Sequence, residues 1–89
     1  MKITIELFGA AREFSNKDTI EVNLLKPGSI KDLRKELLKM NNKKFKGNQN
    51  FKKIIMSSVF CSENDNIVSD NFKIEKKQTF GIIPPVGGG

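Results

Sequence analysis

The sequence contains no histidine, no tryptophan and no tyrosine, and it has a single cysteine, Cys61. The absence of histidine excludes an imidazole-based catalytic triad and a histidine-ligated metal site. One cysteine cannot form an intramolecular disulfide, nor can it build a thiolate zinc site by itself. Chemistry is therefore left to carboxylates, lysines, one thiol and the chain ends, and we expect neither a bound cofactor nor a metal.

Long apolar runs are also missing. No segment approaches the ~18 apolar residues of a membrane span, and the opening MKITIELF lacks the organisation of a signal peptide. The length of 89 residues predicts one domain. The mean hydropathy of −0.40 is typical of a soluble globular chain. We expect a cytoplasmic protein with no membrane partner.

Acidic residues are fewer than basic ones, 10 against 16, which gives a formal net charge of +6. Such a charge is compatible with an acidic partner, a phosphorylated ligand or nucleic acid. However, most of the basic residues are lysines scattered through a sequence that is also rich in asparagine. A solvated surface is the favoured interpretation, and we expect no nucleic-acid partner. The lysine pairs in question are Lys43 and Lys44, Lys52 and Lys53, and Lys76 and Lys77.

Two strands and one helix are predicted in the first half. Residues 2–8 and 19–24 alternate between apolar and polar side chains, which predicts a hairpin of half-buried strands with a long connecting loop. Ser29 is a good N-cap, and Asp32 three residues later resembles a capping box. An apolar stripe of helical period follows, which predicts a helix over residues 29–40.

The second half predicts further strands. Residues 41–53 are rich in asparagine and lysine, and we expect a loop that Phe45 and Phe51 attach to the core. The remaining expected elements are a strand over 54–61, a turn at 63–66, a short strand at 67–68 and a last strand at 79–83. The predicted order is β-β-α-β-β-β, an α+β fold in which one helix packs on one face of a mixed sheet. Ubiquitin-like β-grasp domains have this order and size.

The C-terminal segment, PPVGGG at residues 84–89, is the most unusual feature. Glycines at a chain end make no core contacts, and without Cβ atoms the backbone can pass between close walls. Two prolines stiffen the base of such an arm. We predict a domain at residues 1–83 and a flexible tail at 84–89 that presents the terminal carboxylate. An unstructured end without function is the alternative interpretation.

Both ends of the chain resemble the small subunit of molybdopterin synthase. The ending IIPPVGGG closely resembles the P-P-V-x-G-G terminus of that family. Residues 8–13, FGAARE, resemble its F-[AG]-x-x-R-E segment after the first strand, and residues 67–80 fit its spacing without a gap. The chain departs from the family at residues 75–79, EKKQT, where D-G-D-E-[VI] is common, so basic charge replaces acidic charge there.

The resemblance implies a sulfur carrier that is the non-catalytic subunit of its synthase. In that family an E1-like adenylyltransferase and sulfurtransferase uses ATP to adenylate the C-terminal glycine, here Gly89. Sulfur transfer then gives a thiocarboxylate. The tail enters the large subunit and donates sulfur to precursor Z, a cyclic pyranopterin monophosphate, to form the dithiolene of molybdopterin. The implied assembly is a heterotetramer with two large subunits at its centre.

The resemblance also implies roles for particular residues. Gly87 and Gly88 would thread the channel of the partner, and Pro84, Pro85 and Val86 would orient the arm. An apolar docking surface would comprise Phe8, Ile67 and Ile83, for which ordinary core or edge packing is the alternative. Arg12 would pair with an acidic group of the partner, or it is a solvated loop charge.

Other functions remain open at this stage. The same tail chemistry serves carriers for thiamine synthesis or tRNA thiolation, and a ubiquitin-like modifier would form isopeptide bonds from Gly89. A basic binding module with an inert tail is a further alternative. Cys61 could relay sulfur, but within an apolar strand a free cysteine is more often a small buried hydrophobe.

Overall fold

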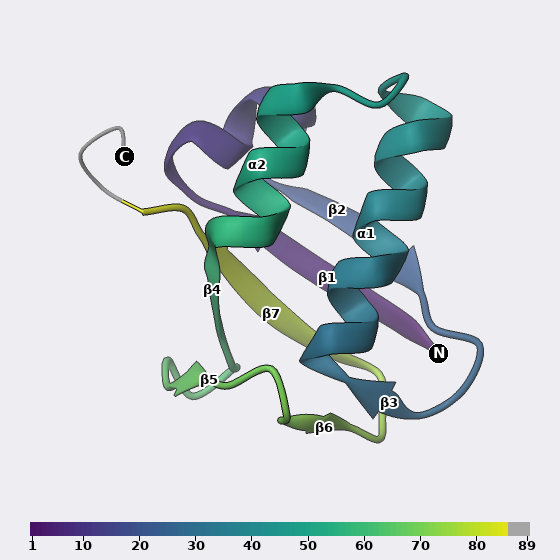
Figure 1. The fold of residues 1–89 in the computed structure, drawn as a ribbon. Helices are drawn as coiled ribbons and strands as arrows, with labels where there is room; N and C mark the ends of the chain where they lie inside the picture. Colours follow the sequence, from purple (N-terminus) through teal and green to yellow (C-terminus); the bar gives the residue numbers. More distant parts are fainter. Residues whose placement is uncertain (86–89) are drawn as a thin grey trace.

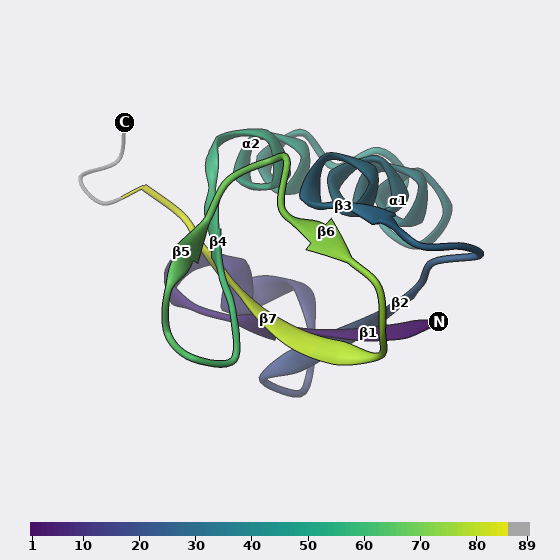
Figure 2. The same ribbon diagram turned by 90° about the horizontal axis from the view of Figure 1, so that it is seen from below.

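The computed structural model describes residues 1–85 and has a five-stranded mixed sheet with both α-helices on one face (Figures 1 and 2). The strand order is β2-β1-β7-β4-β5, in which β1 and β7 are parallel and the other neighbours antiparallel. A second sheet of two short strands, β3 and β6, lies at one end. The elements are β1 (Lys2–Leu7), the 3-10 helix η1 (Gly9–Phe14), β2 (Thr19–Asn23), β3 (Gly28–Ser29), α1 (Ile30–Lys44), α2 (Gln49–Ser57), β4 (Val59–Cys61), β5 (Ile67–Val68), β6 (Lys73–Ile74) and β7 (Gln78–Ile83).

The predicted N-terminal hairpin is confirmed. Lys2 pairs with Asn23 and Glu6 with Thr19 in antiparallel register. The apolar residues of β1 all face the helices and are buried, as their alternation predicts. The long connection between the strands contains η1, whose Ala11 is fully buried.

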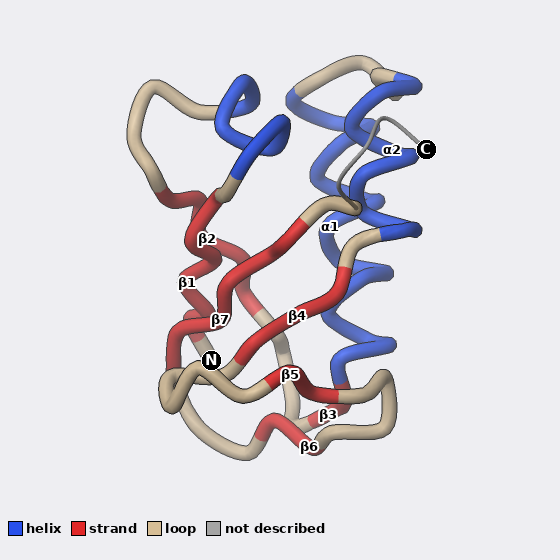
Figure 3. Tube along the Cα trace, turned by 90° about the vertical axis from the view of Figure 1, so that its left-hand side faces the viewer, coloured by secondary structure: helices blue, strands red, loops and turns tan. Residues whose placement is uncertain are grey.

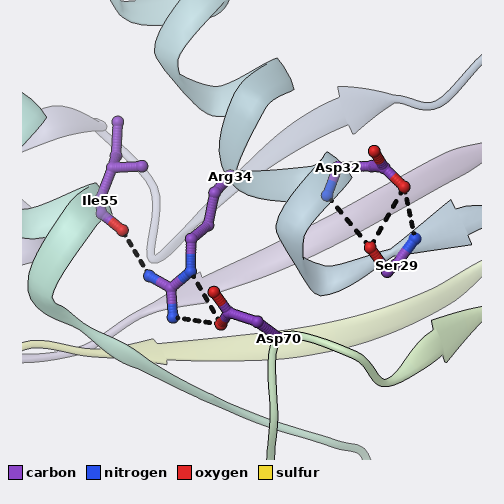
Figure 4. A network of polar contacts seen from close by, with 5 residues as sticks. All are labelled: Ser29, Asp32, Arg34, Ile55 and Asp70. Carbon is purple, nitrogen blue, oxygen red and sulfur yellow. Dashed lines mark hydrogen bonds and ion pairs between the residues drawn. The ribbon is translucent and has the colours of Figure 1, made fainter.

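The predicted helix is also confirmed, and it extends four residues further than its expected end. Ser29 and Asp32 form the capping box drawn in Figure 4. The backbone N–H of Ser29 donates to Asp32 Oδ2 at 2.8 Å, and the Ser29 hydroxyl accepts from the Asp32 N–H at 3.4 Å. The backbone and side-chain hydrogen bonds from Ser29 lower the pKa of the Asp32 carboxyl.

Two predictions for the middle of the chain are wrong. Residues 41–53 are not a loop, because α1 continues to Lys44 and α2 begins at Gln49; the strand expected over 54–61 is confined to β4. Asn48 caps α2, since its side chain accepts from the N–H of Phe51 at 3.0 Å. Phe51 and Ile55, four residues apart, are fully buried on the inner side of α2. Capping and burial therefore favour a helix despite the polar composition.

The expected attachment of this region to the core is confirmed. Phe51 stacks on Phe14 of η1 with ring centroids 4.4 Å apart, and Phe45 meets Phe51 edge-on at 5.2 Å. These three rings join the N-terminal connection to both helices. They hold α2 beside η1 at the end of the sheet where β7 finishes (Figure 1).

Arg34 connects α1 to the second half of the chain (Figure 4). Its Nη1 donates to the carbonyl of Ile55 at 2.6 Å, and its Nε and Nη2 donate to Asp70 Oδ1 at 3.1 and 3.0 Å. The guanidinium also lies over the ring of Phe60, 4.9 Å from its centroid. The Ile55 carbonyl belongs to the last turn of α2, where no intrahelical donor is available, so Arg34 fixes the end of that helix.

The remaining strands follow the prediction closely. The turn at 63–66, β5 and β7 lie where the sequence places them, whereas the small sheet of β3 and β6 was not predicted. Because β7 is the central strand and runs parallel to β1, both strands end at the same edge of the sheet (Figure 3). No helix in the described part of the chain is both long and apolar enough to cross a membrane.

Candidate functional site

The base of the C-terminal segment lies at the end of the central strand. Ile83 is the last residue of β7, and Pro84 and Pro85 leave the sheet where β1 ends and β4 begins. Gly9 lies beside them, since a Cβ added there would be 4.0 Å from Pro84 Cδ. Pro84 is half-buried and Pro85 is exposed. The residues expected to form the rest of the arm, Val86, Gly87, Gly88 and Gly89, lie outside the described residues.

A groove of about 280 Å³ adjoins this point, between η1 and α2. Its walls come from a helix that the sequence did not predict, so this groove was not anticipated. The two prolines form one end of it. It is lined by Ala10, Glu13, Asn50, Lys53, Ile54, Ser57, Pro84 and Pro85.

The sheet has an open face, which α1 and α2 do not cover. Val59 pairs with Ile83, and Cys61 pairs with both Gly81 and Ile67, so these residues share one face. The residues between them, such as Phe60, are fully buried on the opposite, helix-covered face. Apolar side chains thus gather on the open face next to the tail base. We name this set the open-face patch: Phe8, Val59, Cys61, Ile67 and Ile83.

Exposure distinguishes the open-face patch from the core. Ile67 is 70% exposed, Phe8 44% and Val59 41%, whereas Ile83 and Cys61 are half-buried. Isolated exposed apolar residues are ordinary, but several on one face mark an interaction surface. Phe8 and Ile67 are therefore not core residues, and the predicted docking residues Phe8, Ile67 and Ile83 do come together on one face. Their binding role stays a prediction.

Gly81 permits the placement of Phe8. A Cβ on Gly81 would lie 2.8 Å from Cε2 of Phe8 and 2.9 Å from Sγ of Cys61. The aromatic ring therefore lies across the backbone of β7, where only glycine leaves room for it. Gly81 was not among the predicted site residues. The signal that could have identified it is a lone glycine inside an otherwise apolar strand, which indicates close approach of another group.

The structure also places Arg12, whose role stays a prediction, and Cys61. Arg12 lies on η1 and already has a partner, because its Nη2 is 2.7 Å from Asp18 Oδ1 in an exposed ion pair. Cys61 is half-buried on the open face rather than buried in the core. The interpretation of Cys61 as a buried hydrophobe is therefore wrong, because β4 presents this position to the uncovered side of the sheet.

Among residues 1–85, no three acidic or cysteine side chains come together as a metal site. Two carboxyl groups in residues 1–85 have lowered pKa values, and both shifts have structural causes. Ser29 lowers the pKa of Asp32 in the helix cap, and the hydrogen bond from Lys2 lowers the pKa of Glu21. The open-face patch is therefore an apolar surface beside the start of the C-terminal segment.

The sequence model of the ThiS family matches residues 5–89. No curated protein matches the chain. Solved structures with a similar fold include SAMP1 from Haloferax volcanii, 14% identical with a TM-score of 0.67, both chains being covered completely. A putative subunit 1 of the molybdopterin converting factor from Pyrococcus furiosus is 24% identical with a TM-score of 0.64, covering 96% of this chain and 98% of that one.

A third similar structure is a complex of subunits 1 and 2 of the molybdopterin-converting factor from Helicobacter pylori. The matched chain is 18% identical with a TM-score of 0.60, and both chains are covered completely. At these identities the likeness shows the fold. The predicted α+β architecture, a β-grasp with a mixed sheet and a main helix on one face, is confirmed.

Proposed function

The chain belongs to the ThiS family of small ubiquitin-like sulfur carriers, and from this premise we propose that it is the sulfur-carrying small subunit of a molybdopterin synthase. Its terminal glycine, Gly89, would carry the sulfur as a thiocarboxylate. The sulfur would pass to precursor Z to form the dithiolene of molybdopterin. ATP would be consumed by the activating enzyme and not held by this chain.

The observation that carries the proposal is the position of the tail base beside the open-face patch. Pro84 and Pro85 follow the central strand, and the patch lies on the open face over the last residues of that strand and its neighbours. The four residues beyond Pro85 span at most ~14 Å when fully extended. A partner that receives Gly89 must therefore approach the domain closely, and the apolar surface next to the tail base is the surface it would meet.

The chemistry of the arm needs no acid, base or metal from this chain. A free carboxylate is a poor electrophile, so its oxygen first attacks the α-phosphorus of ATP, which releases pyrophosphate and gives an acyl-adenylate. Sulfide (HS⁻) released from the sulfur donor then attacks the acyl carbon and displaces AMP, so that a C–S bond forms as the C–O bond to the phosphate breaks. The resulting thiocarboxylate sulfur is a good nucleophile at the end of a thin arm. The catalytic residues would reside in the partners, which agrees with a sequence that has no histidine.

Two partners follow from this proposal. The Helicobacter pylori structure contains subunits 1 and 2 together, and we propose the corresponding large subunit as the acceptor partner of this chain, in a heterotetramer. The second partner is the E1-like enzyme that loads the tail. Both would use the open-face patch, so their binding would be mutually exclusive. Arg12 is exposed, and an acidic group of a partner would compete with Asp18 for it.

The test is reconstitution with proteins from the same host. The wild-type chain, incubated with its activating enzyme, ATP, a sulfur donor, the large subunit and precursor Z, should yield the dithiolene. Deletion of Gly89 should abolish synthesis and leave the unfolding temperature unchanged. A deletion variant that still supports synthesis contradicts the proposal. Sulfur passed only to a thiamine precursor or to tRNA would assign the carrier to that pathway instead.

A matched pair of variants tests the docking surface. Ile67→Ala on the open face and Leu25→Ala in the turn after β2 both truncate exposed apolar side chains, 70% and 91% exposed. Ile67→Ala should weaken binding to the large subunit by about tenfold, since interface anchors commonly contribute more than 1 kcal/mol. Leu25→Ala should leave it unchanged. Equal affinities for the two variants would exclude the open-face patch as the docking surface.

A further inference from the structure

The net positive charge of the chain lies in the segment that contains both α-helices. Residues 30–58, which include both α-helices, contain nine basic and two acidic residues, a net charge of +7. The rest of the chain contains seven basic and eight acidic residues, a net charge of −1. Because α1 and α2 lie side by side on one face of the sheet, this charge lies on the helical side of the molecule (Figures 1 and 2).

A stripe of lysines follows α1. Lys31, Lys35, Lys39 and Lys43 recur every four residues, so they follow one another along the helix at intervals of ~6 Å. All four are exposed, and among the described residues only Lys39 has an ion-pair partner, Glu36 at 3.3 Å. Like charges four residues apart destabilise a helix. The stability of α1 therefore does not explain why four lysines occur at this spacing.

Two further exposed lysines, Lys52 and Lys53, lie on α2. We name the four lysines of the α1 stripe the lysine face: Lys31, Lys35, Lys39 and Lys43. Lys53 instead lines the groove beside the tail base. The described residues of the two helices include one large exposed apolar side chain, Met56. Protein–protein interfaces are depleted in lysine at their centres and enriched in aromatic residues, methionine and arginine. Interfaces with nucleic acids are polar and strongly positive. The composition of the lysine face matches that of interfaces with nucleic acids.

We propose that the lysine face binds the phosphate backbone of double-helical nucleic acid without reading its sequence. The arginine of this layer, Arg34, is engaged with Asp70 and Ile55, which leaves it unable to contact base edges. The exposed aromatic residue of the described chain, Phe8, lies on the open face, so no platform for base stacking accompanies the lysines. Lysine acts on phosphate as a point charge, which suits backbone contacts.

This proposal revises the expectation that the chain has no nucleic-acid partner. That expectation rested on lysines scattered in the sequence, whereas four of them follow one another along α1. The open-face patch lies on the other side of the sheet and stays free when the lysine face is occupied. A carrier bound to nucleic acid could therefore still dock the partners that use the open face.

The test measures affinity against salt concentration with two labelled probes, a short RNA duplex and a DNA duplex of the same sequence. The triple variant K31Q/K35Q/K43Q removes three charges from the lysine face. The matched control K73Q/K76Q/K77Q removes three charges from the segment around β6 and the start of β7. Both leave the same net charge. Neutralising the stripe relieves repulsion within α1, so the unfolding temperature of the first variant should not fall.

Wild type should bind both duplexes at low salt, with an affinity that falls steeply as salt rises. The stripe variant should lose about tenfold or more in affinity at low salt, and its slope of log affinity against log salt should be shallower by about 2–3. The control should keep nearly the wild-type slope. Tighter binding of the RNA duplex would assign the partner as RNA, and equal binding would confirm recognition of the backbone alone.

Three results would overturn the proposal. The wild-type chain binds neither duplex at low salt; the two triple variants lose affinity equally, which shows an effect of net charge alone; or a glutamate-rich peptide binds more tightly than the duplexes. The last result would assign the lysine face to an acidic protein. None of these outcomes depends on sulfur loading of the tail, so the proposed carrier function is tested separately.

Discussion

The two faces of the sheet are built from the same alternating strands but differ in what covers them. On the helical side, side chains such as Phe51 and Phe80 are fully buried. On the open face, Phe8 and Ile67 remain exposed beside the tail base. Apolar area that is buried stabilises the fold, whereas apolar area that stays in contact with water is available to a partner. Burial therefore separates the residues that hold this domain together from those that we assign to docking.

Two phenylalanine truncations should separate these faces most clearly. Phe51→Ala removes a fully buried ring that packs on Phe14 and Phe45, and it should cost about 3–5 kcal/mol of stability. Phe8→Ala removes a ring that is 44% exposed, and it should cost less than about 1 kcal/mol while weakening binding to the large subunit by about tenfold. Urea unfolding and titration calorimetry give the two quantities. Equal losses of stability would remove the distinction between the faces.

Arg34 tests how the helical layer is fastened. Arg34→Lys keeps the charge but cannot reach Asp70 and the Ile55 carbonyl together, so it should cost about 1–3 kcal/mol. Lys35→Gln, one position further along α1 and exposed, is the control and should change the stability by less than about 0.5 kcal/mol. Chemical denaturation measures both. If the two variants proved equally stable, the contacts of Arg34 would not anchor α2.

A substitution at Gly81 tests how the placement of Phe8 contributes to the open-face patch. Gly81→Val places atoms where the Phe8 ring and the Cys61 sulfur lie, so it should cost about 1–3 kcal/mol and displace Phe8 from the open-face patch. Binding to the large subunit should weaken in parallel. Thr79→Val, on the same face of β7, is the matched control and should stay close to wild type. A Gly81→Val variant with unchanged stability and affinity would show that the placement of Phe8 is unimportant.

The cap of α1 gives the smallest effect. Ser29→Ala removes the hydroxyl that accepts from the Asp32 N–H, which should cost about 0.5–2 kcal/mol at neutral pH. Partner binding through the open face should be unaffected. Thermal unfolding and calorimetry measure the two effects, and weaker partner binding at neutral pH would argue against the independence of the two faces.

The same cap predicts a dependence on acid. Because folding lowers the pKa of Asp32, the unfolded chain binds more protons in acid, and the stabilisation is lost as the pH falls below about 4. Asp32→Asn should therefore lose less stability than wild type between neutral pH and pH 3. Some loss should remain, since Lys2 lowers the pKa of Glu21 in the same way. The urea concentrations at the midpoint of unfolding, measured for both proteins at the two pH values, test this prediction.

The sequence predicted the elements whose local signals agree with their environment. The hairpin and α1 have clear periodicity, and the Ser29 cap marks the start of the helix. The second helix was missed because its composition suggests a loop, although Phe51, Ile54 and Ile55 have helical spacing and Asn48 is a good cap. The apolar run after it looked like one strand, yet it contains the end of α2 and the start of β4.

The site was predicted in part. The residues Phe8, Ile67 and Ile83 came from a family resemblance. The register of β4, β5 and β7 places Ile67 and Ile83 on one face, and the ring of Phe8 lies against Gly81 on that face. Gly81 has a local signal, a lone glycine in an apolar strand, but the groove beside the tail depends on contacts between distant segments, which no local pattern contains. Residues 86–89 lie outside the described part of the chain, so the arm itself rests on the sequence.

Intact mass spectrometry of the protein purified from its own host tests the central claim most directly. A sulfur carrier should contain a species heavier by the difference between one sulfur and one oxygen atom, and fragmentation should locate the change at Gly89. Oxidation of methionine or of Cys61 gives a similar shift, so the location decides the interpretation. A terminus that remains an unmodified carboxylate, even after incubation with ATP, a sulfur donor and the cognate activating enzyme, would contradict the assignment as a sulfur carrier.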